Sequence, residues 1–283
     1  MIYSTQMNLS MTGELADAYK SGSQRARVVT EAWGEHNLYC PNCSSPKLDR
    51  LSHNTKASDF CCPGCRFWFQ LKGQKSRIGN SVSDGAYAAM MNAIACDETP
   101  NFYFLHYDLA TWSIKNLLLV PSFAFPTSAI IKRNPLAATA RRAGWIGCNI
   151  ALHRIPADAR ISLVKESNVV PACEVREQFK RVKPLKEISV AQRGWTLDVL
   201  TAIRQLVERG SVTRSTSANA TRCDSQSRAP GEFTNEDIYA LVPHFEKLHP
   251  GNRHIRDKIR QQLQVLRDLC LLMHFGKGEW RLS

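Results

Sequence analysis

The sequence contains no apolar run long enough to cross a lipid bilayer as a helix, so a helical membrane protein is excluded. Its N-terminal stretch, MIYSTQMNLSMTGELADAYK, lacks the basic start and the apolar segment of a secretory signal peptide. No internal repeat is visible either. These absences lead us to expect a cytoplasmic protein that is not bound to a membrane.

Acidic residues are scarce beside basic ones. The 283 residues include 25 aspartates and glutamates and 37 lysines and arginines, which give a formal net charge of +12. Such an excess favours a polyanionic partner, most simply nucleic acid, although a basic chain can also be merely soluble. The length suggests either one large domain or two ordinary ones.

Ten cysteines in a reducing compartment favour metal ligation or free thiols over disulfides. Two C-x-x-C pairs stand out, Cys40 with Cys43 and Cys62 with Cys65. Each pair forms a short knuckle, and four sulfurs together complete the tetrahedral coordination of a structural zinc ion. Cys61 could compete with its neighbour, but its spacing fits the knuckle less well. Reduced cysteines without a metal are the alternative.

The segment SDFCCPGCRFWFQLK, residues 58–72, also has the spacing of a nuclease site. One common nuclease site places an acid on one strand, and a second acid and a lysine two residues apart on the next. Asp59 would be the first acid, while Gln70 and Lys72 share one face of the strand FWFQLK. Asp59 and Gln70 would then hold a magnesium ion, and Lys72 would assist the attacking water.

Gln70 departs from this pattern, because a glutamine oxygen can coordinate magnesium but brings no charge, and hard cations prefer carboxylates. Three alternatives stay open at this point. The spacing is a chance match, or the fold is that of a nuclease without activity, or another acid such as Glu31 completes the ion site.

Hydrophobic periodicity predicts a mixed α/β domain over residues 1–185. A helix is expected over residues 14–33, and a second helix over SDGAYAAMMNAIA is expected to begin at Ser83 or Asp84. The stretches FWFQLK, NFYFLHYDL, KNLLLVPSF and RISLVKE are expected to be strands. The zinc knuckle Cys62–Cys65 would form the tip of a hairpin between two strands.

A second domain, mainly helical, is predicted over residues 190–283. Residues 211–231 are rich in Ser, Thr and Arg and poor in large apolar residues, so a flexible insertion is expected there. Thr234 and Asp237 have the spacing of an N-terminal capping box. An amphipathic helix over residues 252–269 and two short strands in MHFGKGEWRL complete this domain.

Several segments in the same order closely resemble the DpnI family of methyl-directed restriction endonucleases: SQRARVVTEAW, YCPNC, DGAYAAMM, NPLAATARRAGWIGCNI, RGWTLDVL and HIRDKIRQQLQVLRD. The resemblance is interrupted mainly by residues 211–231. It implies a PD-(D/E)xK nuclease domain with an embedded zinc site, followed by a winged-helix domain. It also implies magnesium-dependent cleavage of double-stranded DNA at GATC sites that carry N6-methyladenine.

Carried over by position, the resemblance makes Asp59 the first acid and Lys72 the lysine, and the family's glutamate falls on Gln70. Glutamine occurs at this point elsewhere in the wider superfamily, so we expect a restriction endonuclease that keeps its activity and acts as a monomer. The competing hypothesis is a catalytically inactive methyl-DNA-binding protein, or regulator, on a decayed nuclease scaffold.

The stretch TARRAGWIGCN is predicted to contact DNA. Arg141 and Arg142 can bind phosphates or read guanine edges, and the neighbouring glycines let the backbone approach DNA. Trp145 offers a flat apolar face for the methyl group of the modified adenine. A tryptophan that simply packs the domain core is the alternative.

Helix 252–269 is expected to be the recognition helix of the winged helix, with FGKGEWRL as the wing. The candidate DNA contacts lie opposite the apolar stripe of the helix and on the wing, and they are Arg253, Arg256, Lys258, Arg260, Gln261, Lys277 and Arg281. A solvated helix face is the alternative. DNA binding should weaken steeply as the salt concentration rises.

Overall fold

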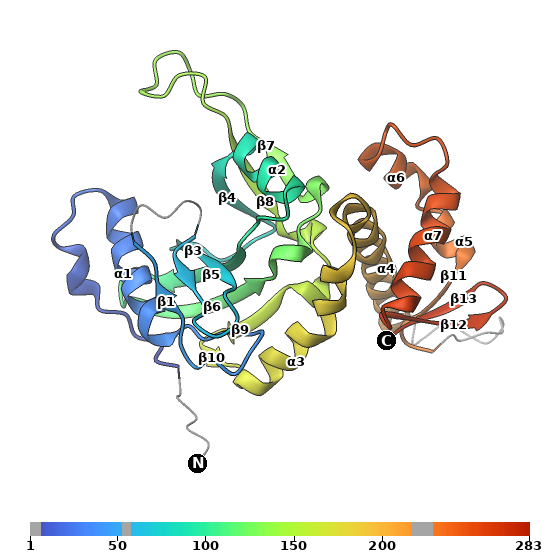
Figure 1. The fold of residues 1–283 in the computed structure, drawn as a ribbon, viewed down its shortest axis with the longest axis horizontal. Helices are drawn as coiled ribbons and strands as arrows, with labels where there is room; N and C mark the ends of the chain where they lie inside the picture. Colours follow the sequence, from blue (N-terminus) through green and yellow to red (C-terminus); the bar gives the residue numbers. More distant parts are fainter. Residues whose placement is uncertain (1–6, 53–57, 217–228) are drawn as a thin grey trace.

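The computed structural model describes residues 7–52, 58–216 and 229–283, and it contains two parts joined by one long helix (Figure 1). The N-terminal part is built on a seven-stranded sheet in the order β1-β2-β3-β5-β6-β9-β10. Strands β3 and β5 are parallel, and the other neighbours are antiparallel. The strands are β1 (Asp49–Arg50), β2 (Phe60–Cys61), β3 (Trp68–Gln74), β5 (Asn101–Asp108), β6 (Ser113–Val120), β9 (Ile161–Lys165) and β10 (Asn168–Val169).

The central strands lie in the core because their side chains are apolar on both faces. In β5 every residue from 101 to 105 is buried. In β3 the predicted alternation is confirmed, since Phe69 and Leu71 are buried and Trp68 is exposed. One helix packs against β3 and another against β9, and they are α1 (Gly22–Asn37) and α3 (Ala172–Val182).

The predicted helix over residues 14–33 is broken in the structure. A 3-10 helix covers Gly13–Ala16, and α1 begins only at Gly22. Leu15 and Tyr19, two large apolar residues within the expected helix, are both exposed. Short helices depend on the packing of an apolar face for their stability. Because these two side chains are exposed, they provide little of that packing between Ala16 and Gly22.

A second sheet has three strands in the order β4-β8-β7 and carries helix α2. The prediction that Ser83 or Asp84 begins this helix is wrong, because both residues lie in β4 and the helix begins at Tyr87. Pairing with β8 overrides the local helix signal, and Asp84 lies opposite Cys148. The elements are β4 (Ser81–Ala86), α2 (Tyr87–Ala95), β7 (Ile130–Lys132) and β8 (Gly147–Ala151).

The C-terminal part combines helices with a three-stranded sheet in the order β11-β13-β12. The predicted capping box is confirmed, since Thr234 and Asp237 each accept a hydrogen bond from the backbone N–H of the other. The amphipathic helix is also confirmed and buries Ile255, Ile259 and Leu263. The elements are α4 (Val190–Thr216), β11 (Glu232–Thr234), α5 (Asn235–Tyr239), α6 (Val242–Leu248), α7 (Ile255–Asp268), β12 (Leu272–Gly276) and β13 (Glu279–Leu282).

Residues 211–216 continue α4, so the predicted flexible insertion over residues 211–231 is wrong for its first part. Extending an existing helix costs less than starting one, which lets polar residues follow the apolar first half of α4. Residues 217–228 lie outside the described residues. Within the ranges that are described, no helix has both the length and the apolar character to span a membrane.

Helix α4 contacts both parts of the molecule. Arg193 near its start pairs with Asp97 of the N-terminal part. The buried Asp198 accepts a hydrogen bond from Ser128 of the N-terminal part, and its other oxygen lies 2.9 Å from His249 Nε2 of the C-terminal part. One helix therefore contacts both the N-terminal part and the C-terminal part.

Candidate active site

The hairpin of β2 and β3 carries two of the four predicted zinc ligands, and the predicted catalytic residues lie at its base. Phe60 lies opposite Phe69, and residues 62–67 form the connecting loop. This loop holds two of the four predicted zinc ligands at the tip of the hairpin, and Asp59 precedes β2 at its base. The predicted position of the zinc knuckle is therefore confirmed.

Four cysteine sulfurs meet at this tip. The Sγ atoms of the four-cysteine cluster all lie within 4.8 Å of one another, and the residues are Cys40, Cys43, Cys62 and Cys65. Two of the separations, Cys40 to Cys65 and Cys43 to Cys62, are 3.5 Å. A tetrahedral zinc ion with Zn–S bonds of about 2.3 Å separates its sulfurs by roughly 3.8 Å, so the donors fit this ion. The cluster has the donor set of a structural zinc site.

The surroundings act differently on the thiols of the cluster, because burial raises the pKa of Cys43 and, more strongly, that of Cys40 above the ordinary value. Although burial raises the pKa of the Cys62 thiol, hydrogen bonds from backbone N–H groups of the knuckle and from neighbouring thiols lower it to about 7. Arg176 of α3 donates a hydrogen bond to the Cys43 carbonyl oxygen at 3.0 Å. Cys61 is not a member of the cluster, and its sulfur contacts a backbone carbonyl oxygen instead.

The base of the hairpin positions Asp59 beside β3. The Asp59 N–H donates to the Phe69 carbonyl oxygen at 2.9 Å, and the Leu71 N–H donates to Asp59 Oδ2 at 2.8 Å. Gln70 and Lys72 are half-buried on the face of β3 opposite to Leu71. The three predicted catalytic residues thus come from one hairpin, with the Asp59 carboxylate held against the backbone between Gln70 and Lys72.

Burial raises the pKa of the Asp59 carboxyl group above its ordinary value, and the charge of Glu31 raises it further. A backbone N–H and the positive charges of Lys72 and Arg27 oppose this shift. Glu31 is therefore close enough to act on Asp59 electrostatically. However, one of its oxygens accepts from Arg27 and the other accepts from Arg50 at 2.8 Å, which does not favour Glu31 as an ion ligand.

A further acidic residue meets Lys72 from the second sheet. Asp84 Oδ1 lies 2.6 Å from Lys72 Nζ, and the Asp84 side chain is 7% exposed. Lys72 Nζ also lies 5.9 Å from the centre of the Phe102 ring. Sequence reasoning missed Asp84 because it placed this residue at a helix start. Val82 and Asp84 are two residues apart between exposed neighbours, and this spacing could have indicated a strand but not the contact with Lys72.

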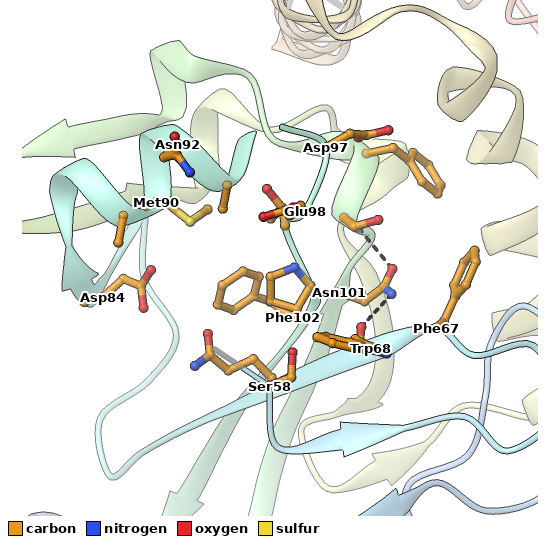
Figure 2. A pocket seen from close by; sticks show the side chains of 18 of the residues that line it. Ser58, Phe67, Trp68, Asp84, Met90, Asn92, Asp97, Glu98, Asn101 and Phe102 are labelled. Atoms are coloured by element: carbon orange, nitrogen blue, oxygen red, sulfur yellow. Dashed lines mark hydrogen bonds between the residues drawn. The ribbon is translucent and has the colours of Figure 1, made fainter. Parts of the chain in front are cut away.

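These side chains open into a cavity of about 880 Å³. Gln70, Lys72 and Asp84 line one part of it, and Figure 2 shows Asp84 among the side chains that surround it. Ser58 also lines the cavity, whereas its neighbour Asp59 does not. The structure therefore brings Gln70, Lys72 and Asp84 to one open space, with Asp59 adjacent to it.

Carboxylate and amide oxygens are ligands for hard cations such as magnesium, and an ammonium group offsets the negative charge of a phosphate. The cavity leaves room for a substrate, which a closed shell of four sulfurs does not. The donor set at the hairpin base therefore fits a divalent cation, and its open side suits a phosphate diester.

The predicted DNA-contacting stretch TARRAGWIGCN lies mainly in the loop that projects between β7 and β8 (Figure 1). Arg141 and Arg142 are exposed, and Trp145 is half-buried. The Arg142 guanidinium lies 4.4 Å from the centre of the Trp145 ring. A side chain at Gly147 would come within 2.8 Å of that ring. Trp145 is thus fixed by its neighbours, and Arg142 covers part of the apolar surface predicted to receive a methyl group.

The remaining predicted DNA contacts lie on or beside α7 and on the hairpin β12–β13. Lys258 and Arg281 are half-buried, and the exposed ones are Arg253, Arg256, Arg260, Gln261 and Lys277. Lys258 Nζ donates to Gln261 Oε1 at 2.8 Å. Lys277 lies at the turn of the hairpin between two glycines with positive φ, and this turn presents its side chain to solvent.

Sequence reasoning missed an exposed aromatic residue on the wing. Phe275 is 52% exposed, and the Arg281 guanidinium lies 4.9 Å from the centre of its ring. Single exposed apolar side chains are common on protein surfaces, so Phe275 alone does not mark a contact surface. The signal in the sequence is a phenylalanine directly before the glycine turn of a short hairpin.

Two family models match the chain. The model of the DpnI family, described as the Dam-replacing family, matches residues 7–188 and so contains the four-cysteine cluster and the hairpin base. The model of the DpnI C-terminal domain, described as the Dam-replacing HTH domain, matches residues 227–282 and so contains α7 and the wing. The chain therefore belongs to the DpnI Dam-replacing family and carries that family's C-terminal helix-turn-helix domain.

Proposed function

We propose that this protein is a magnesium-dependent endonuclease that cuts double-stranded DNA at GATC sites carrying N6-methyladenine. The observation that carries the proposal is the hairpin base, where Asp59, Gln70 and Lys72 meet beside an open cavity in a chain of the DpnI family. The net charge of +12 and the helix-turn-helix domain support DNA as the substrate. The protein would act as a monomer.

Asp59 and Gln70 would hold the magnesium ion through side-chain oxygens. When bound, the ion offsets the negative charge that develops on the scissile phosphate and favours the ionised form of water. Lys72 orients the attacking water and places a positive charge beside the phosphate. The hydrogen bond from the Leu71 N–H keeps the Asp59 carboxylate in position for this role.

The four-cysteine cluster would hold a zinc ion that fixes the loop between β2 and β3. Asp59 lies at one side of this hairpin, and Gln70 and Lys72 lie on the other. A fixed loop therefore holds Asp59 close to Lys72. This role is structural, because four sulfurs leave no open position on the ion.

We assign recognition of the methyl group to Trp145. Its ring offers apolar surface to the methyl group that only the modified adenine carries, while Arg141 and Arg142 contact phosphates or guanine edges. The winged helix adds affinity and a second check of methylation through α7 and the wing. Its contacts with DNA would be Arg253, Arg256, Lys258, Arg260, Gln261, Lys277 and Arg281.

One observation favours a second candidate, a methyl-DNA-binding protein that does not cut. Gln70 supplies no charge where the family resemblance implies a glutamate, and magnesium affinity depends strongly on carboxylates. Such a protein would keep the loop with Trp145 and the winged helix, and it would recognise the same methylated sites.

Digestion of methylated and unmethylated plasmid DNA with magnesium tests the proposal. We expect cutting of methylated DNA only, and loss of that cutting in Lys72→Ala with DNA binding retained. Lys180→Ala, at an exposed lysine of α3, is the matched control and should cut like the wild type. Binding of methylated DNA without any cutting by the wild type would support the second candidate instead.

A further inference from the structure

The proposed active site is short of negative charge. Asp59 is a carboxylate, Gln70 is neutral and Lys72 is positive, so the three side chains together carry no net charge. Hard divalent cations bind several oxygens and prefer carboxylates, so this set alone is a weak ligand set. A second carboxylate in the same cavity would remove the deficit.

Asp84 is placed to provide this charge. It reaches the site from β4 of the second sheet, outside the hairpin. Its carboxylate lies 2.6 Å from Lys72 Nζ and lines the same cavity as Gln70 (Figure 2). A carboxylate that is only 7% exposed is costly to bury unless a cation or hydrogen bonds compensate its charge. Lys72 provides that compensation here.

Two other acids, Glu31 and Asp97, are engaged differently. Both oxygens of Glu31 are bonded to arginines, and Asp97 pairs with Arg193 of α4. Arginine holds a carboxylate with a rigid planar fork, whereas the ammonium group of lysine is a point charge on a flexible stem. Asp84 is thus an acid whose partner can turn away and leave an oxygen for a metal ion.

We infer that Asp84 is the second carboxylate of this active site and binds the divalent cation together with Asp59 and Gln70. The inference rests on the proposed function, because it assigns a further residue to the same site. Without the cation, Asp84 neutralises Lys72. With the cation, Lys72 is released to face the phosphate. Gln70 is tolerated because position 84 carries the charge that position 70 lacks.

Manganese binding to the full-length, zinc-containing protein tests this inference without any need for cleavage. In isothermal titration calorimetry with Mn²⁺, we expect Asp84→Asn to weaken binding by at least about 10-fold, because loss of a group that only supports a metal ligand already costs about 10- to 100-fold. Glu98→Gln is the matched control, because Glu98 lines the same cavity and loses the same charge (Figure 2). It should bind Mn²⁺ like the wild type.

A second carboxylate at position 70 separates ligation from a merely structural role. We expect Gln70→Glu to restore Mn²⁺ binding in the Asp84→Asn background, because it returns the lost charge to the same site. A carboxylate at position 70 also strengthens Mn²⁺ binding when Asp84 is present, so Gln70→Glu alone is measured as the reference. If both carboxylates bind one ion, Asp84→Asn should weaken binding less in the Gln70→Glu background than in the wild type. An equal loss in both backgrounds would overturn the inference.

Removal of Asp84 leaves Lys72 without its partner, so the single variant could lose its fold. In that case Lys72→Met is compared with Lys72→Met/Asp84→Asn, in which neither member of the pair remains charged. Weaker Mn²⁺ binding by the double variant supports the inference, and equal binding overturns it.

The same measurements separate this inference from the proposed function. If the wild type binds Mn²⁺ through Asp84 but does not cut methylated DNA with either metal, the proposed function fails and the ligand assignment stands. If the wild type cuts and Asp84→Asn binds Mn²⁺ and cuts equally well, the assignment fails and the proposed function stands.

Discussion

The two ends of the β2–β3 hairpin are built on opposite principles. At the tip, four sulfurs lie within 4.8 Å of one another, and Arg176 braces the backbone that carries one of them. At the base, Gln70 and Lys72 face a cavity of about 880 Å³ beside the half-buried Asp59. The tip has four identical sulfur donors, enough for the complete tetrahedral coordination of one ion. The base has chemically different groups that leave space for a substrate.

This difference teaches what each end contributes. A closed shell stabilises the fold because its ligands are satisfied by one ion and admit no substrate. A site with a half-buried carboxylate, a lysine and free space stabilises the folded state less, because removing a carboxylate from water costs free energy. Substitutions at the tip should therefore reduce stability, and substitutions at the base should reduce reactivity.

The largest effect is expected at the tip. Cys43→Ser should lower the free energy of unfolding by more than about 4 kcal/mol, because loss of a structural metal is among the most destabilising changes known. Denaturant unfolding together with zinc analysis measures it. Cys61→Ser is the matched control, since Cys61 lies in the same hairpin but outside the cluster. If both variants kept zinc and stability, the tip would not be a metal site.

At the base, Asp59→Asn should lower the cleavage rate by roughly 10³-fold, since charge stabilisation by a metal ion contributes several kcal/mol to such reactions. The fold should be retained, because an asparagine oxygen can still accept from the Leu71 N–H. Single-turnover cleavage and denaturant unfolding measure the two effects. If Asp59→Asn lost as much stability as Cys43→Ser, the base would be a structural site like the tip, which contradicts the expectation.

The stability of Asp59→Asn relative to the wild type should depend on pH. Because burial raises the pKa of Asp59, the folded protein binds the proton of this group more tightly than the unfolded chain does. The contribution of Asp59 to stability therefore falls as the pH rises through the unfolded and then the folded pKa. Asp59→Asn lacks this loss, so its stability relative to the wild type should increase from acidic pH, at which zinc is still bound, to neutral pH.

Trp145 lies outside the hairpin. Trp145→Ala should therefore change the preference for methylated DNA, but neither the stability that depends on the tip nor the reactivity that depends on the base. Burying one methyl group is worth about 0.8 kcal/mol, so the preference for methylated over unmethylated GATC should fall about fourfold. Trp145→Phe keeps an aromatic face and should keep more of the preference. Competition cleavage of the two substrates measures it, and an unchanged ratio in folded Trp145→Ala would assign methyl recognition elsewhere.

The smallest effect is expected on the wing. Lys277→Ala should reduce the slope of log binding constant against log salt concentration by about 1, since one phosphate contact is lost. Stability and zinc content should not change, which separates this surface from both ends of the hairpin. Fluorescence anisotropy at several salt concentrations measures the slope. Lys180→Ala is the control, and an equal change in both variants would argue against a specific contact.

The parts of the site that could be predicted from the sequence are local in the chain. The two C-x-x-C knuckles and the pair Gln70 and Lys72 each span a few residues, and strand alternation places Gln70 and Lys72 on one face. The capping box at Thr234 and the stripe of α7 were predictable for the same reason. Each pattern is a short-range rule of one helix or one strand.

Asp84 could not be predicted because its contact with Lys72 joins two different sheets. The residues Ser83 and Asp84 before an apolar helical run are a usual helix start, and only pairing with distant β8 makes them a strand. The break before Gly22 has a similar cause, because exposure of Leu15 and Tyr19 is decided by packing rather than by spacing.

The position of α4 in the chain also determines which sites are completed first while the protein is synthesised. The chain emerges from its N-terminus, and domains generally fold as units in that order. The four-cysteine cluster and the proposed active site lie before α4, whereas α7 follows it, and the C-terminal part contacts α4 through His249 and Asp198. A growing chain would thus complete the proposed active site before it completes the helix-turn-helix domain.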